Sequence, residues 1–199
     1  MRSVILIGLA ALGACNIATS PAAPTNEAAA VNSGAGNDAL GGAAEANAAA
    51  PAATQWQGAV VLAGDGLTSS GARVAFDIPR AEAERLVGAA LGAPKGTGRN
   101  EECGQGPVDT TEFEGGMILS FQDGKFVGWD AREGSSFAAA NGVRVGMTRQ
   151  ALQALGGATI EESSLGHELT IGGISGLLSG TEPTATITSL WAGSTCIFR

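Results

Sequence analysis

The sequence predicts an α+β domain in which a strand, a helix and an antiparallel hairpin occur twice in tandem. Two segments carry this prediction: VAFDIPRAEAERL at residues 74–86 and VRVGMTRQALQAL at residues 143–155. Each alternates apolar and polar residues, as a strand does, and then changes to the apolar spacing of a helix. We therefore expect two repeats, at about 72–131 and 141–199, that form one sheet with the helices on one face.

The first fifteen residues read MRSVILIGLAALGAC and predict a bacterial signal peptide over residues 1–14. Arg2 supplies a positive start, and Val4–Leu12 form an apolar run that is too short to span a bilayer. This leader is a targeting segment, so it takes no part in the predicted fold.

Leu12-Gly13-Ala14-Cys15 resembles the lipobox of bacterial lipoproteins. The resemblance implies that Cys15 carries diacylglycerol and, on its new amino terminus, an acyl chain such as palmitate. Asn16 stands where an inner-membrane retention signal often has Asp, so the resemblance favours the periplasmic side of the outer membrane. The alternative is an ordinary secretory signal that is cleaved near Ala18 or Ala22.

Residues 15–54 are dominated by Ala, Asn, Pro and Gly and are expected to form a flexible tether to the folded domain, residues 55–199. The chain has a formal net charge of −8 and no run of basic residues. This argues against binding to nucleic acid and against electrostatic docking on anionic lipid. Membrane contact is expected through the lipid anchor, and the expected partner is an envelope protein.

The first predicted strand alternates Val74, Phe76 and Ile78 with smaller or polar residues. Pro79 is compatible with the first turn of a helix. The helix that follows places four apolar residues at helical spacing. These are Ala83, Leu86, Val87 and Ala90.

The second predicted strand carries Val143, Val145 and Met147. Thr148 is a suitable N-cap for the next helix. The apolar stripe of this helix is shorter, and a pair of glycines ends it. The stripe consists of Leu152 and Leu155, and the glycines are Gly156 and Gly157.

Each helix is followed by an expected hairpin that ends in tryptophan. Asp123-Gly124 favours a two-residue type I′ turn, which would place Phe121 opposite Phe126 and Ile118 opposite Trp129. The second hairpin, residues 174–191, has a longer turn at 181–184 and ends in Trp191. Both tryptophans are expected in the core or in cross-strand pairs, with a ligand or partner surface as the alternative. Residues 56–62 add a strand before the first repeat.

Cys103 and Cys196 remain after lipidation of Cys15, in a compartment that permits disulfides. We expect them to form a disulfide that joins the two repeats. Two free buried thiols or redox chemistry are the alternatives. The single histidine and the lack of a Cys-x-x-Cys motif argue against zinc, so neither a metal nor another cofactor is expected.

Gly146-Met147-Thr148, with Leu152 four positions after the threonine, resembles the helix entry of two kinds of periplasmic repeat module. They are those of the SmpA/BamE lipoproteins and of the β-lactamase inhibitory protein. Asp77-Ile78-Pro79 fits the same entry loosely. The resemblance implies an α+β fold and binding to other proteins, and it brings no catalytic residues. Leu190–Arg199 is similar to the end of uncharacterised lipoproteins, a likeness that implies no function.

The sequence thus favours a non-catalytic protein-binding, inhibitory or assembly factor of the envelope rather than an enzyme. The alternative is a small periplasmic hydrolase that acts on cell-wall or glycan material. That reading requires carboxylates or the histidine to meet in one cleft. The candidates are Glu101, Glu102, Glu162 and His167. Gly173-Ile174-Ser175-Gly176 does not have the spacing of a nucleophile elbow.

Overall fold

The computed structural model describes residues 58–197, which form an α+β domain with two helices and two sheets. The predicted signal peptide, Cys15, the tether and Trp56 lie outside the described residues. The elements are β1 Val60–Ala63, β2 Gly66–Ser69, β3 Ala72–Ala75, α1 Arg80–Leu91, β4 Gly96–Asn100, β5 Val108–Phe113, η1 Glu114–Gly116, β6 Met117–Gln122, β7 Lys125–Ala131, β8 Ala138–Ala139, α2 Arg149–Leu155, β9 Thr159–Ser163, β10 Gly166–Ile171, β11 Ile174–Leu178 and β12 Ile187–Gly193.

The larger sheet contains eight strands in the order β4-β5-β6-β7-β12-β11-β10-β9. Every neighbouring pair in it is antiparallel. Strands β4–β7 follow α1 along the chain, and β9–β12 follow α2. The last strand of each group lies at the centre, where β7 pairs with β12.

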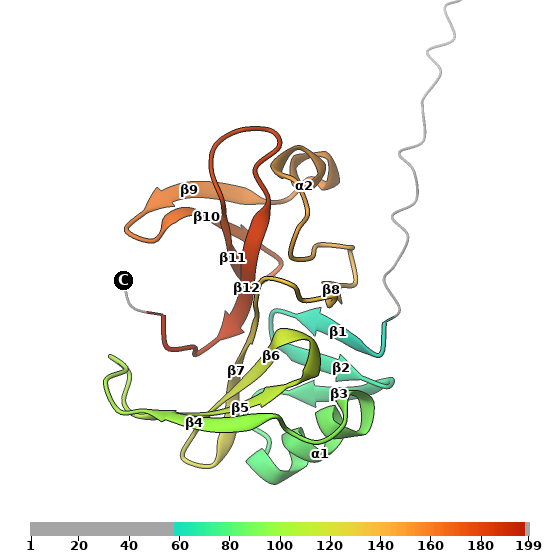
Figure 1. Ribbon diagram of the computed structural model, residues 1–199, viewed down its shortest axis with the longest axis vertical. Coiled ribbons are helices and arrows are strands. Elements are labelled where there is room, and N and C mark those ends of the chain that lie inside the picture. The colour runs from blue at the N-terminus through green and yellow to red at the C-terminus, as the bar shows by residue number, and fades with distance from the viewer. Residues whose placement is uncertain (1–57, 198–199) are drawn as a thin grey trace, which may run out of the picture. The chain divides into compact units, whose positions relative to one another are not determined.

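The prediction of one sheet is wrong, because a smaller sheet in the order β3-β2-β1-β8 packs against the larger one. Its apolar side chains, including Leu62, Leu67 and Val74, are buried in the common core. The Trp129 indole N–H donates a hydrogen bond of 3.0 Å to the carbonyl of Ala63, which joins the two sheets. Both helices and the smaller sheet lie on one side of the larger sheet (Figure 1).

The predicted strand at residues 74–78 is only partly correct. Strand β3 ends at Ala75, and the chain turns at Asp77, whose φ is +69°. Phe76 and Ile78 still pack against the core from outside the strand. The alternation of apolar and polar residues therefore indicates which side chains are buried. It does not indicate how long the strand is.

The predicted strand at residues 143–147 is wrong. Val143, Val145 and Met147 are buried, but they lie in a connection that makes an isolated bridge from Arg144 to Ala138. Gly146 has a φ of +80°, a left-handed conformation that breaks an extended strand. The connection is instead held by main-chain hydrogen bonds to β12, for example from the Gly146 N–H to the Ile187 carbonyl at 2.7 Å.

The structure confirms both predicted helices. In α1, Ala83 and Val87 are buried, and Leu86 and Ala90 pack beside them. Pro79 is the residue just before this helix.

In α2 the Thr148 hydroxyl accepts a hydrogen bond of 3.2 Å from the Ala151 N–H, and the helix ends before Gly156 as expected. Leu152 is buried. Leu155 is 41% exposed, so the second half of the predicted stripe is wrong.

The β6–β7 hairpin confirms the turn and corrects the register. Asp123 and Gly124 both have positive φ, and Phe121 lies opposite Phe126. Beyond this pair the register shifts by one residue, which leaves Val127 as a bulge. Trp129 consequently lies opposite Leu119, and the predicted pair of Trp129 with Ile118 is wrong.

Candidate functional site

One face of the larger sheet lies opposite the side that holds the helices and the smaller sheet (Figure 1). We call it the open face. One row of cross-strand partners runs along it through all eight strands. In sheet order the row is Gly96, Glu112, Ile118, Asp130, Trp191, Ser175, Thr170 and Thr159. Most of these side chains are small or polar, and Gly96, Glu112, Thr170 and Thr159 are exposed.

The centre of the open face is covered by the end of the chain. Residues 194–197, which we call the strap, follow β12, and Cys196 forms the expected disulfide with Cys103. A Cβ at Gly193 would collide with the Val127 carbonyl oxygen, so the strap turns where only glycine fits. The Ser194 N–H donates a hydrogen bond of 2.8 Å to the same carbonyl. The bulge in β7 thus presents the acceptor that holds the strap.

Two cavities flank the disulfide, and Cys196 and Ile197 line both. One, of about 340 Å³, contains Cys103, Val108 and Trp191 in its lining. The other, of about 330 Å³, we call the Asp130 cavity. It is lined by Gly98, Arg99, Asn100, Thr110, Ile118, Ser120, Asp130, Arg132, Cys196 and Ile197. Both volumes lie near the lower end of the range for small-ligand sites.

Asp130 is the polar residue at the centre of the row. Its cross-strand partners are Ile118 and Trp191, which are only 8% and 6% exposed. Burial between them raises the pKa of Asp130 to about 6, and the opposing attraction of Arg132 is the weaker effect. The open face therefore holds a carboxyl group that has lost much of its contact with water and still ionises above about pH 6.

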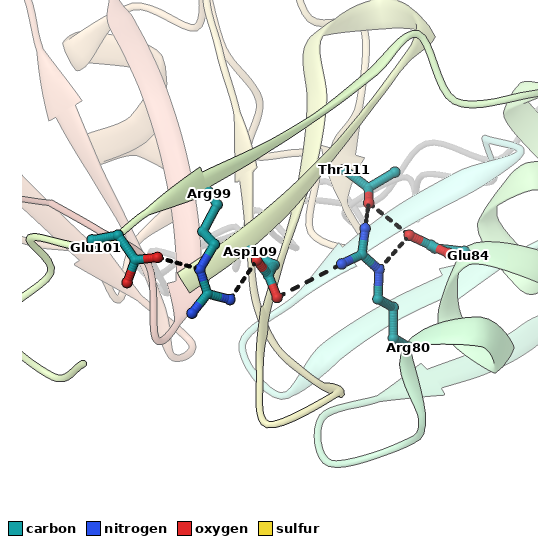
Figure 2. A network of polar contacts seen from close by, with 6 residues as sticks. All are labelled: Arg80, Glu84, Arg99, Glu101, Asp109 and Thr111. Carbon is teal, nitrogen blue, oxygen red and sulfur yellow. Dashed lines mark hydrogen bonds and ion pairs between the residues drawn. The ribbon is translucent and has the colours of Figure 1, made fainter. Parts of the chain in front are cut away.

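A second polar group of residues lies on the other side of the sheet, where α1 meets β5 (Figure 2). Arg80 Nε donates to Glu84 Oε1 at 2.8 Å, and Arg80 Nη2 donates to the Thr111 hydroxyl at 3.0 Å. That hydroxyl in turn donates to Glu84 at 2.6 Å. The Arg80 guanidinium also lies 4.8 Å from the centre of the Phe121 ring, within cation–π range.

The network continues outward to the edge strand β4 (Figure 2). Asp109 lies 3.9 Å from Arg80 and accepts a hydrogen bond of 3.0 Å from Arg99. Glu101, assisted by Asp109, raises the pKa of Arg99 above its usual value. Because every charge in this network has a partner of opposite sign, we interpret it as the attachment of α1 to the sheet.

The residues of the hydrolase reading do not share a strand or a cavity. Glu101 and Glu102 are exposed and follow β4, and Glu101 is paired with Arg99. Glu162 and His167 are cross-strand partners on β9 and β10. Strands β4 and β9 are the two opposite edges of the larger sheet, so the structure brings these residues together only within each pair.

The sequence reasoning missed Asp130 and Arg132. A signal was present, since Asp130 stands between two apolar residues of a predicted strand and must face away from the core. The strap that covers Asp130 comes from residues far along the chain, so no short stretch of the sequence predicts the cavity.

No protein family model, curated protein or solved structure matches the chain. Within residues 58–197, no helix is both long and apolar enough to cross a membrane. The same part of the chain places no three His, Cys, Asp or Glu residues where they could hold a metal ion together.

Proposed function

We propose that this chain is a non-catalytic binding factor of the bacterial envelope, anchored through Cys15, that recognises a basic protein surface with its open face. The observation that carries the proposal is the row of small, polar and acidic side chains across eight strands. Such a face gives a partner hydroxyl and carboxylate groups to hydrogen-bond and little apolar area to bury. The tryptophans do not form the contact surface in this proposal, because Trp129 and Trp191 are buried.

The charge of the face supports a basic partner. Glu112 and Asp130 belong to the row, and Glu161 and Glu168 lie opposite each other on β9 and β10. Arg132 is the basic side chain beside Asp130. A partner of opposite charge would associate faster and be selected over acidic proteins, an effect that added salt weakens.

We also propose that the domain arose by duplication of one helix and four strands. The order α1-β4-β5-β6-β7 is followed along the chain by α2-β9-β10-β11-β12. The two groups meet through their last strands, which is the arrangement that a two-fold relation between copies produces. The two copies differ in the segments that precede their helices.

The proposal is tested by capturing the tagged, lipidated full-length chain from cells after chemical cross-linking. Glu161→Lys with Thr170→Lys reverses one charge of the open face and adds another positive charge, both on exposed positions. Glu182→Lys with Thr184→Lys, in the exposed loop between β11 and β12, makes the same change in charge and is the matched control. We expect a reproducible envelope protein with the wild-type chain and the control, and its loss with the open-face variant. Equal capture by all three chains would overturn the assignment of the face.

A further inference from the structure

The Asp130 cavity has an acidic floor and a fixed roof. Trp129 and Ala131 point into the core, so Asp130 points to the opposite side of β7 and lines the cavity. The roof is the strap, which the disulfide and a 3.1 Å hydrogen bond from the Asn100 amide to Cys196 Sγ hold in place. The carboxyl group therefore sits in an enclosure that the fold builds from three distant segments.

The groups around the carboxyl favour a small cation. Ser120 places a hydroxyl group in the lining, two residues along β6 from Ile118, the cross-strand partner of Asp130. An ammonium group has three N–H donors, which the carboxylate and the hydroxyl oxygen can accept. The apolar Ile118 and Ile197 suit the methylene chain that would carry the ammonium.

We propose that the Asp130 cavity binds an aliphatic ammonium group, the end of a lysine side chain, with Asp130 as its counter-ion. The inference rests on the proposed function, since the lysine belongs to the basic protein partner. The bound lysine neutralises a carboxylate that the fold leaves desolvated, which makes the cavity an anchor point for the partner.

Occupancy depends on pH through the Asp130 carboxyl. The other charged groups in the lining are Arg132, which directly follows β7, and Arg99 on β4, and Arg99 is paired with Glu101 and Asp109. Binding is therefore expected above pH 6 and is lost as the pH falls and the carboxylate takes up a proton.

The test is an NMR titration of the lipidated full-length chain in detergent micelles with n-butylammonium chloride at pH 7. Sodium chloride at equal ionic strength controls for salt, and n-butanol controls for the apolar chain. Asp130→Asn keeps the shape and removes the charge, and Glu182→Gln removes a charge from the exposed loop between β11 and β12, outside the cavity. The readout is the saturation of shifts at residues that line the cavity.

We expect saturable binding to the wild-type chain and to Glu182→Gln, and binding weaker by about tenfold or more in Asp130→Asn. The wild-type chain should lose the binding at pH 5. Equal binding by Asp130→Asn, equal binding of n-butanol, or no saturable shift in the wild-type chain would overturn the inference. If the probe fails while the charge-reversal experiment still succeeds, the cavity assignment falls and the proposed function stands.

Discussion

Two rows of residues, one position apart on the larger sheet, face opposite surroundings. The core row is Phe113, Met117, Ala131, Leu190, Gly176, Leu169 and Ile160. It is apolar, and all but its last residue are buried. The open-face row is small or polar except at Ile118 and Trp191, which are buried near the strap. The difference shows that one face holds the domain together, while the other is covered only at its centre and keeps a desolvated carboxyl there.

The largest expected effect is a difference in stability between a variant on the core face and a variant on the open face. Trp129→Ala removes a fully buried side chain and its hydrogen bond to Ala63, so it should lower the free energy of unfolding by about 3–5 kcal/mol. Thr170→Ala, on the exposed part of the open face, should change it by about 0.5 kcal/mol or less. Urea unfolding of both variants measures the difference. Equal losses of unfolding free energy in the two variants would mean that the open face contributes as much to stability as the core face.

The next effect concerns the strap. Replacing Cys103 and Cys196 by serine together should lower the free energy of unfolding by about 2–5 kcal/mol, because the bond closes a long loop. It should also expose Trp191, which would appear as an additional tryptophan accessible to acrylamide quenching. This increase in quenching should vanish when Trp191→Phe is added to the double serine variant. Unchanged quenching would show that the strap does not need the disulfide to cover the face.

Asp130 provides a smaller effect that depends on pH. Its folded-state pKa of about 6 lies above the unfolded value of 3.8, so the folded state binds the proton more tightly. The stability tied to this proton is present below pH 4 and is lost as the pH rises through 6, by an amount on the order of 3 kcal/mol.

Asp130→Asn removes this dependence, so its advantage over the wild-type chain should grow between pH 4.5 and pH 7. Urea unfolding at the two pH values, taken as the difference between the chains, isolates the effect from the other carboxylates. A difference that stays constant with pH would contradict the desolvated position of Asp130.

The smallest effect lies on the core side, at the start of α2. Thr148→Ala removes the N-cap hydrogen bond to Ala151 and should cost about 1 kcal/mol, whereas Thr148→Ser should cost less. Thermal unfolding of the two variants checks this order. A loss as large as that of Trp129→Ala would mean that α2 holds the core more firmly than its single buried residue, Leu152, suggests.

The sequence predicts the elements that depend on local chemistry. The Thr148 cap, the Gly156 stop and the Asp123-Gly124 turn are each set by a few adjacent residues, and all three are present. The Cys103–Cys196 bond also follows from counting cysteines.

What depends on distant contacts could not be predicted. Val127 becomes a bulge, and its carbonyl holds Ser194. Val143 and Val145 alternate like a strand, because apolar burial in a connection gives the same pattern. The Asp130 cavity needs β4, β7 and the strap together.

The central claim is that the open face is the surface that meets the partner. Its most direct test is site-specific photo-crosslinking in cells, with the photoreactive residue placed at Thr170 or Thr159 on the open face, or at Arg85 on the exposed side of α1. We expect one envelope protein to be cross-linked from the two open-face positions and not from Arg85. Cross-links from Arg85 alone, or equally from all three positions, would contradict it.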